Sequence, residues 1–315
     1  MPMPSPTLLL VGPTAVGKTA ALDALAHDFP TVHLEIISAD SRQVYRMMNI
    51  GTATPDVQER RRTPHHLIDV ISPGESWDVG QFVEAADALI PRIRARGAVP
   101  VICGGTAFYH QGYIFGLPGT PRASVALRRR LEDRLDREGL EALRRELREV
   151  DPESDRRIAP NDRYRVVRAL EVYHTSGRPL TAYGVPSTPR SGVAPVVVGL
   201  YRTREELYRR IAVRVDRMFE EGLPEEVARV LELGYSPTAP GLRTIGYREF
   251  FDVGGHPPWS DATLEQVRAL IVRNTRRYAK RQETFFRRLS GVQWIHADDG
   301  QRLRDASAPV LDTHR

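Results

Sequence analysis

The sequence contains a single cysteine, Cys103, so it cannot form an intramolecular disulfide or a multi-cysteine metal site. Cys103 lies in an apolar stretch, where a thiol normally behaves as a small buried apolar side chain. No run of about eighteen uncharged apolar residues occurs, so no membrane-spanning helix is expected. The first six residues lack the charged segment and cleavage site of a secretory signal. These absences favour a globular protein in a reducing cytoplasm.

Lysine is also scarce, because Lys18 and Lys280 are the only two in 315 residues and every other cation is arginine. The net charge is +5 and the sequence pI is about 9.5. Arginine suits phosphate groups because its planar guanidinium donates two parallel hydrogen bonds. An arginine-rich genome explains the same bias, so composition alone does not establish a nucleic-acid partner. Against this background, a lysine at position 18 indicates chemistry that a bulky guanidinium cannot perform.

The order of elements predicts two kinds of structure along the chain. Apolar strands are expected at 8–11, 32–38 and 99–103, with helices beginning at 19–26 and spanning 79–95, a pattern typical of a parallel sheet covered on both faces. Between turn-rich breaks at 117–121 and 181–195 the chain is charged and helical, and a strand returns at 196–200. From residue 203 onward we expect helices only, including 205–221, 224–234 and 261–289. The predicted parts are 1–117 (core), 118–193 (helical insertion) and 194–315 (core, with basic C-terminal helices).

A phosphate-binding loop is the strongest signal in the chain. It fits G-x-x-x-x-G-K-[ST] at every fixed position, and it follows an apolar strand and opens a helix. The loop consists of Gly12, Pro13, Thr14, Ala15, Val16, Gly17, Lys18 and Thr19. Its N–H groups, the helix N-terminus and Lys18 favour phosphate, and the Thr19 hydroxyl can bind Mg²⁺. The sequence therefore predicts an α/β fold: a P-loop NTPase-like core with a parallel sheet flanked by helices, plus an all-helical insertion domain.

The loop does not identify the substrate, since any diphosphate or triphosphate fits it. No apolar strand ends in the Asp-Glu pair that a motor-type ATPase uses to hold Mg²⁺. A small-molecule kinase that binds ATP remains open on this observation.

Polar residues follow the second and third predicted strands. Asp40 lies just beyond the second strand, at the end that faces the ligand crevice in an open α/β sheet. There it could accept a proton from a nucleophile, or simply cap a helix. The segment 104–106 ends the third strand, and Thr106 could stabilise a departing phosphate oxygen or cap a helix. For His65 and His66 a structural role is favoured over a metal site, because no further ligand has suitable spacing.

Taken together, an ordered set of segments resembles the tRNA dimethylallyltransferase family, also called tRNA isopentenyltransferases. The P-loop is followed by Ser-Ala-Asp-Ser-Arg-Gln-Val-Tyr at 38–45 and Pro-His-His-Leu-Ile-Asp at 64–69. Further matches are 49–53, 104–106, 161–162, 165, 168–172, 214–218, 222–223, 245–249 and Tyr-Ala-Lys-Arg-Gln at 278–282. Single pieces are weak, but the ordered set spans nearly the whole chain and is highly specific.

The resemblance implies transfer of a dimethylallyl group from dimethylallyl diphosphate to the N6 amine of adenosine 37 in tRNA, with Mg²⁺ required. It implies that Asp40 is the general base, that the P-loop binds the diphosphate, and that Thr106 and Arg214 hold the diphosphate and its bridging oxygen. Residues expected to contact tRNA, with Arg128 added from the basic insertion, are Asp40, Ser41, Arg42, Gln43, Arg128, Tyr164, Arg165, Val166, Val167, Arg168, Arg243, Thr244, Ile245, Gly246, Tyr247 and Arg248.

Basic residues are concentrated outside the diphosphate core. The last long helix is expected to carry Arg273, Arg277, Lys280 and Arg281 on one broad face. Such a face is often only solvated surface, yet its placement favours the anticodon stem-loop of tRNA, bound between core and insertion with strong salt dependence. We expect a monomer. The competing hypotheses are the P-loop small-molecule kinase and a non-catalytic RNA-binding module, which would leave the P-loop unexplained.

Overall fold

The computed structural model describes residues 5–121 and 123–312, so most of the N-terminal stretch used in the signal-peptide argument, residues 1–4, lies outside the described residues. The chain forms two compact units. Unit 1 comprises Met1–Ile114 and Arg190–Arg315, and unit 2 is Phe115–Pro189. Among the described residues, no helix combines the length and apolar character needed to cross a bilayer.

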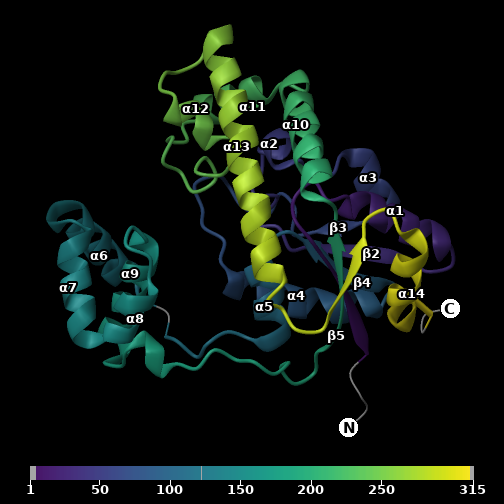
Figure 1. Ribbon diagram of the computed structural model, residues 1–315, viewed down its shortest axis with the longest axis horizontal. Helices are drawn as coiled ribbons and strands as arrows, with labels where there is room; N and C mark the ends of the chain where they lie inside the picture. The colour runs from purple at the N-terminus through teal and green to yellow at the C-terminus, as the bar shows by residue number, and fades with distance from the viewer. Residues whose placement is uncertain (1–4, 122, 313–315) are drawn as a thin grey trace. The chain divides into compact units, whose positions relative to one another are not determined.

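Unit 1 is built on a six-stranded parallel sheet (Figure 1). In spatial order the strands are β3 (His65–His66), β2 (Leu34–Ser38), β4 (Val99–Gly104), β1 (Pro6–Val11), β5 (Ala194–Tyr201) and β6 (Val292–His296). The predicted parallel sheet is confirmed, and the chain returns to it after unit 2 through β5, which pairs with β1. The central strand β4 is buried along its whole length, and β1 is buried except at Pro6, as expected when helices cover both faces.

Two strands escaped the sequence analysis. The expectation that the chain is purely helical after residue 203 was wrong, because Val292–His296 forms the edge strand β6 beside β5. Its five residues are mostly half-exposed, so it lacks the continuous apolar run that marked the central strands. β3 is only two residues long and pairs with β2. Its His66 ring nitrogen Nε2 lies 2.6 Å from Glu35 Oε2, which agrees with a structural role for this histidine.

Helices cover the sheet. α1 (Lys18–Asp28) and α14 (Gly300–Leu311) share one core cluster with side chains of β1, β4 and β5. α4 (Val79–Arg94) packs against β2 and β4, and α5 (Ala107–Phe115) follows β4. Cys103 lies buried in β4, where desolvation raises the pKa of its thiol to about 11. The thiol therefore stays neutral, as expected for a packing residue.

A second core cluster of unit 1 lies beyond the sheet and holds the long helices together. It joins α10 (Arg204–Glu220), α11 (Leu223–Glu232), α12 (Arg248–Asp252) and α13 (Asp261–Phe286). Residues of the short α2 (Asn49–Thr52) pack against the same cluster, and α3 (Val57–Arg62) follows. Ser260 caps α13 by accepting a hydrogen bond from Thr263 N, and the helix then continues for 26 residues.

The regular secondary structure of unit 2 is helical in its described residues. It contains α6 (Val125–Glu138), α7 (Leu140–Val150), α8 (Pro152–Arg157), α9 (Arg163–Ser176) and a 3₁₀ turn at Leu180–Ala182. Leucine and valine side chains of α6, α7 and α9 form its own hydrophobic cluster. The described part of the insertion thus carries helices and no strand, as the sequence predicted.

Candidate functional site

The site forms where three neighbouring strands end. Strand β4 lies between β2 and β1, and its register pairs Cys103 with Ser38 and Gly104 with Val11. The segments after β1, β4 and β2 are the P-loop, residues 104–106 and Asp40, respectively. Parallel strands end on the same edge, so the sheet brings together three motifs that are separated by up to about 90 residues in sequence.

The P-loop curls around Lys18 at the start of α1. Gly17 has φ +112°, a left-handed conformation that glycine adopts without strain. Lys18 Nζ donates to Gly12 O and Pro13 O at 3.0 Å each, which uses two of the three ammonium hydrogens. Burial lowers the pKa of Lys18, and the negative charge of Asp40 opposes that shift. Thr19 is exposed in the first turn of α1, where its hydroxyl is accessible to a metal ion.

Asp40 forms a local turn and does not cap a helix. Its Oδ1 accepts a hydrogen bond from Arg42 N at 2.9 Å. The carboxylate is half-buried and close enough to Lys18 and Arg214 to raise the pKa of both cations against their desolvation. The lone pairs of this carboxylate that Arg42 N does not use can accept a proton from a nucleophile.

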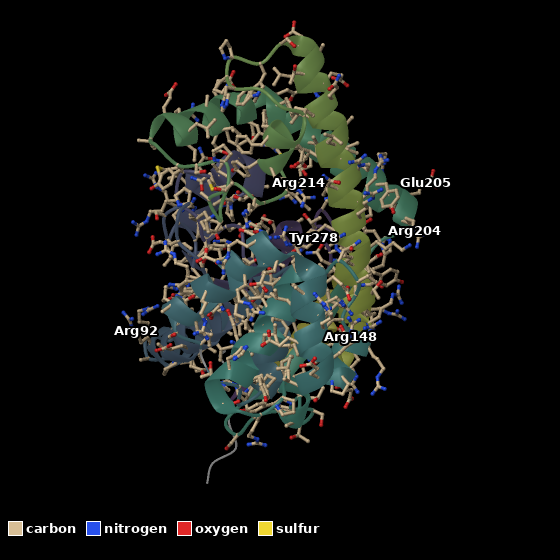
Figure 2. The ribbon with its side chains drawn as sticks, turned by 90° about the vertical axis from the view of Figure 1, so that its left-hand side faces the viewer. Arg92, Arg148, Arg204, Glu205, Arg214 and Tyr278 are labelled. Carbon is tan, nitrogen blue, oxygen red and sulfur yellow. The ribbon has the colours of Figure 1, made fainter. Side chains whose placement is uncertain are left out.

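Arg214 reaches the P-loop from α10. Its Nη1 donates to Thr14 Oγ1 at 3.2 Å, and burial lowers the pKa of its guanidinium. Figure 2 shows that Arg204 and Glu205 extend outward at the start of the same helix, whereas Arg214 lies inside. A guanidinium remains charged even so, and a desolvated cation beside the loop strengthens the attraction for a diphosphate.

Thr106 binds the Asp40 turn. Its Oγ1 accepts from Ser41 N at 3.0 Å and donates to Ser41 Oγ at 3.3 Å, while Thr106 N donates to Ala39 O at 3.0 Å. Thr106, at the end of β4, thus fixes the residues on both sides of Asp40: it holds Ser41 through its hydroxyl and Ala39 through its backbone N–H.

Gln282 is a site residue to which the sequence analysis assigned no role. Its Oε1 accepts from Thr14 N at 2.9 Å, and its Nε2 donates to Gly105 O at 2.7 Å. A Cβ on residue 105 would lie 2.3 Å from that Nε2, so only glycine leaves room for the contact. The amide therefore ties the P-loop to the segment after β4. A polar residue four positions after Tyr278 on one face of a long helix is the signal that could have revealed it.

Tyr278 shares this face of α13. Desolvation raises the pKa of its phenol to about 12, and the charge of Asp40 adds to the shift. The phenol is therefore a neutral hydrogen-bonding group near the carboxylate. Figure 2 shows Tyr278 near Arg214 in that view, away from the exposed arginines.

Gln43 is engaged within the protein at both ends of its amide. Ser38 Oγ donates to its Oε1 at 2.9 Å, and its Nε2 donates to Ala53 O at 3.1 Å. Ser41 is half-buried and Arg42 is exposed on the same turn. Arg42 is the member of this segment whose side chain is most accessible to a large ligand.

The segment 243–248 mixes exposed cations with buried supports. Arg243 is exposed and Arg248 is half-buried, as is Ile245, whereas Thr244, Gly246 and Tyr247 are buried. Tyr247 Oη donates to Glu226 Oε1 at 2.6 Å and accepts from Gly51 N at 3.1 Å. The buried Glu249 accepts from Gly246 N at 2.9 Å and from Asn274 Nδ2 at 2.7 Å. Two buried carboxylates thus shape the loop that presents Arg243.

In unit 2 the predicted tRNA contacts divide in the same way. Tyr164 is 73% exposed and Arg165 is exposed, but Val166 and Val167 are packed in the unit's core. Arg128 Nε and Arg168 Nη1 donate to the buried Glu171 at 2.6 and 3.1 Å. Their charges are therefore partly compensated, and Tyr164 and Arg165 offer the freer surface.

A basic groove runs between α10 and α13 in unit 1. Its volume is about 630 Å³, and Arg273, Arg276, Arg277 and Lys280 line it. Arg276 lies over the ring of Tyr208, 5.1 Å from its centroid. These cations occupy the face of α13 opposite to Tyr278 and Gln282, since residues two apart differ by about 200° around a helix. One face of α13 therefore places Tyr278 and Gln282 at the site, and the opposite face carries the cations of the groove.

A family model described as "IPP transferase" matches residues 43–289. The chain belongs to the IPP transferase family. The tRNA dimethylallyltransferase of Heliobacterium modesticaldum is 43% identical over 310 residues, covering 96% of this chain and 94% of that protein. The corresponding protein of Symbiobacterium thermophilum is 44% identical, covering 98% and 95%. The family resemblance seen in the sequence is therefore confirmed.

Solved structures of the family agree. The tRNA isopentenylpyrophosphate transferase of Bacillus halodurans aligns over 98% of this chain and 97% of its own, with 36% identity and a TM-score of 0.68. A eukaryotic dimethylallyltransferase acting on tRNA aligns over 96% of this chain and 77% of its own, with 26% identity and a TM-score of 0.74. These relatives favour a transferase over the small-molecule kinase that the P-loop alone allows.

Proposed function

We propose that this protein transfers the dimethylallyl group of dimethylallyl diphosphate to the N6 amine of adenosine 37 in tRNA, giving N6-dimethylallyladenosine and diphosphate. The arrangement that carries the proposal is the P-loop with Arg214 at Thr14 and the Asp40 carboxylate beside both cations. The printed names of the relatives, which are tRNA dimethylallyltransferases, supply the substrate classes.

The reaction balances with these groups. The allylic carbon–oxygen bond breaks, the electron pair leaves with the diphosphate, and the carbon forms a bond to N6. The amine loses one proton, which Asp40 accepts. Lys18, Arg214 and the N–H groups of the P-loop stabilise the charge that develops on the diphosphate. The target adenine must leave its stack to reach a buried allyl group, which costs least in a single-stranded loop.

We assign Mg²⁺ to the diphosphate side of the site. The exposed Thr19 hydroxyl is one oxygen ligand, and phosphate oxygens and waters complete a set that Mg²⁺ commonly accepts. When bound, the ion adds positive charge at the leaving group.

For tRNA, we propose that the anticodon stem-loop contacts the exposed members of the predicted set. These are Arg42 and Arg243 in unit 1 and Tyr164 and Arg165 in unit 2. The buried Val166, Val167, Thr244 and Tyr247 support the surface from within. We add the α10–α13 groove as a phosphate-binding surface, and we propose a monomer that acts in the reducing cytoplasm, where Cys103 stays unpaired.

The test uses labelled dimethylallyl diphosphate, total tRNA and Mg²⁺, followed by nucleoside analysis. Label is expected in one modified adenosine, with diphosphate release only when tRNA is present. ATP consumption with a small alcohol or nucleoside would identify a kinase instead. Asp40→Asn should keep tRNA binding and lower turnover by about 10²–10⁴. Asp56→Asn, at the exposed N-cap of α3, serves as the control. Turnover of Asp40→Asn close to wild type would remove Asp40 as the base.

Binding to tRNA should weaken steeply with salt. Each phosphate contact contributes roughly 0.7–0.9 to the slope of log affinity against log salt. Arg277→Ala, in the groove, is expected to reduce that slope by about one, whereas Arg92→Ala, exposed on α4, should leave it unchanged. Equal slopes for the two variants would exclude the groove.

A further inference from the structure

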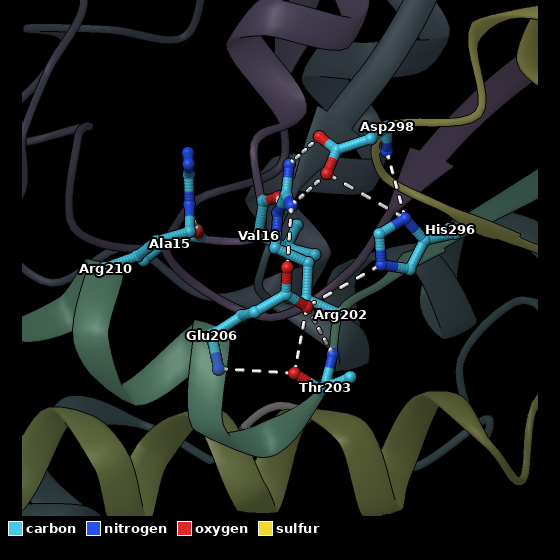
Figure 3. A network of polar contacts seen from close by, with 8 residues as sticks. All are labelled: Ala15, Val16, Arg202, Thr203, Glu206, Arg210, His296 and Asp298. Carbon is cyan, nitrogen blue, oxygen red and sulfur yellow. Dashed lines mark hydrogen bonds and ion pairs between the residues drawn. The ribbon is translucent and has the colours of Figure 1, made fainter.

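A polar network holds the outer side of the P-loop (Figure 3). Arg202, directly after β5, donates from Nε to Val16 O at 2.8 Å. Its two terminal nitrogens bind both carboxylate oxygens of Asp298, with Nη1 at 2.7 Å from Oδ2. Asp298 follows β6, and the β5–β6 register places Tyr201 beside His296. The edge strand that the sequence analysis missed therefore brings Asp298 to the loop.

A second arginine, Arg210, binds the carbonyl of the preceding loop residue, Ala15, in the same way. Arg210, on α10, donates from Nε to Ala15 O at 2.8 Å. A Cβ on Gly17 would lie 3.7 Å from Nη2 of Arg210 and 3.8 Å from Nη2 of Arg202. Both guanidinium groups therefore border the loop at Gly17, and each fixes one of two consecutive carbonyl groups.

The orientation of these carbonyls decides where the N–H groups point. A trans peptide directs its C=O and its N–H to opposite sides. Because Arg202 holds Val16 O on the outer side, the Gly17 N–H of the same peptide is directed to the inner side, where a phosphate binds in a loop of this type. The bond from Arg202 thus orients a donor that the diphosphate needs.

Arg202 depends on Asp298 for its own position. The Arg202 side chain is only 9% exposed, whereas Asp298 is 61% exposed. Glu206 Oε1 lies farther away, at 3.7 Å from Arg202 Nη1, and Glu206 also accepts from Thr203. Glu206, His296 and Asp298 are close enough together to suggest a metal site. The Arg202 cation already binds both Asp298 oxygens, so we assign no ion there.

We propose that Asp298 is a positioning residue of the P-loop. It fixes Arg202, and Arg202 orients the Val16–Gly17 peptide so that the Gly17 N–H points toward the diphosphate of the prenyl substrate. This inference rests on the proposed function, since it gives the loop a diphosphate to bind. Asp298 lies beyond residues 43–289, the range that the family model matches. The C-terminal β6–α14 segment therefore contributes to the site as well as to the fold.

The chain offers a closely matched control. Arg190 Nε donates to Tyr113 O at 2.6 Å, and its terminal nitrogens bind both oxygens of Asp87. This is the same arrangement in the same unit, but it does not involve the P-loop. Asp87 is 45% exposed, comparable to Asp298. Asp87→Asn therefore removes an equivalent ion pair without touching the loop.

The experiment compares Asp298→Asn, Asp298→Glu and Asp87→Asn with the wild type. Binding of inorganic diphosphate is measured by calorimetry, and the KM values for dimethylallyl diphosphate and tRNA are measured with kcat. For Asp298→Asn we expect diphosphate affinity and donor KM to worsen about tenfold, as for loss of one charge-assisted hydrogen bond. The tRNA KM should stay unchanged, the melting temperature should fall no further than in Asp87→Asn, kcat should remain within about twofold, and Asp298→Glu should recover part of the affinity.

Three results would overturn the inference. Asp298→Asn could bind inorganic diphosphate as tightly as the wild type does. Asp298→Asn and Asp87→Asn could lose diphosphate affinity to the same extent. Finally, kcat and the melting temperature of Asp298→Asn could fall together without a change in the KM for dimethylallyl diphosphate. Arg202→Lys, which keeps the charge but loses the two-pronged contact, must show the same defect as Asp298→Asn. Because the calorimetry uses inorganic diphosphate, it remains decisive even when the wild type transfers no prenyl group, a result that would refute the proposed function alone.

Discussion

Gln282 provides the sharpest test of the site as the structure builds it. Its amide joins the P-loop, through Thr14 N, to the segment after β4, through Gly105 O. Gln282→Met keeps the length and shape of the side chain but removes both hydrogen bonds. The P-loop and the segment after β4 should then no longer be joined through residue 282, whereas the packing of α13 should persist.

The expected magnitude follows from burial. Gln282 is 5% exposed, and the bond to Gly105 O is buried, whereas the bond to Thr14 N is half-buried. An unsatisfied buried polar group costs about 1–3 kcal/mol, and water can rescue the half-buried Thr14 N–H in part. We therefore expect a loss of about 2–4 kcal/mol in the free energy of unfolding and a higher KM for dimethylallyl diphosphate. Gln282→Glu keeps an acceptor for Thr14 N but adds an anion, so its donor KM should rise further.

Chemical denaturation and steady-state kinetics with varied donor measure the two effects. Gln301→Met is the control, because Gln301 is exposed on α14 and makes a single side-chain bond to Asp305. A destabilisation of Gln282→Met below about 0.5 kcal/mol, no larger than for an ordinary surface change, would refute the reasoning. So would tighter donor binding, since it would mean that Gln282 competes with phosphate for Thr14 N instead of ordering the loop.

Three further predictions concern charges in the same unit. Lys18→Ala should weaken binding of inorganic diphosphate by at least about tenfold in calorimetry, because it removes the ammonium that the P-loop holds; unchanged affinity would contradict a diphosphate-binding role for the loop. Glu226→Gln should lower the free energy of unfolding by about 2–5 kcal/mol in urea titrations, since Glu226 accepts bonds from Asn49 N, Ile50 N and Gly51 N and an amide cannot accept them all; a loss under about 1 kcal/mol would refute this. Burial lowers the pKa of His110 to about 3, so between pH 6.5 and 3 the unfolded chain binds one more proton and stability falls as the pH falls. The stability difference between wild type and His110→Gln should therefore shrink by up to about 1.4 kcal/mol per pH unit on acidification, and a constant difference would exclude this linkage.

Local signals in the sequence determined much of this protein. The P-loop, the apolar central strands and the helical insertion all follow from patterns within about twenty neighbouring residues, where glycine spacing and apolar periodicity carry the information. The ordered motifs also identified the family, which the comparisons confirm. Asp40, Thr106 and Arg214 could be named from the same motifs.

Only the tertiary structure determined which residues far apart in the sequence contact each other at the site. Gln282 and Thr14 are 268 residues apart, and no local pattern predicts their hydrogen bond. The edge strand β6 is too short and too exposed to be recognised from the sequence pattern. Its pairing with β5 nevertheless places Asp298 within hydrogen-bonding distance of Arg202. Burial likewise divided the predicted tRNA segments into the exposed Arg243 and Tyr164 and the packed Tyr247 and Val166. Sequence patterns report what each segment prefers, whereas contacts between segments depend on strand order and helix packing, which only the folded chain establishes.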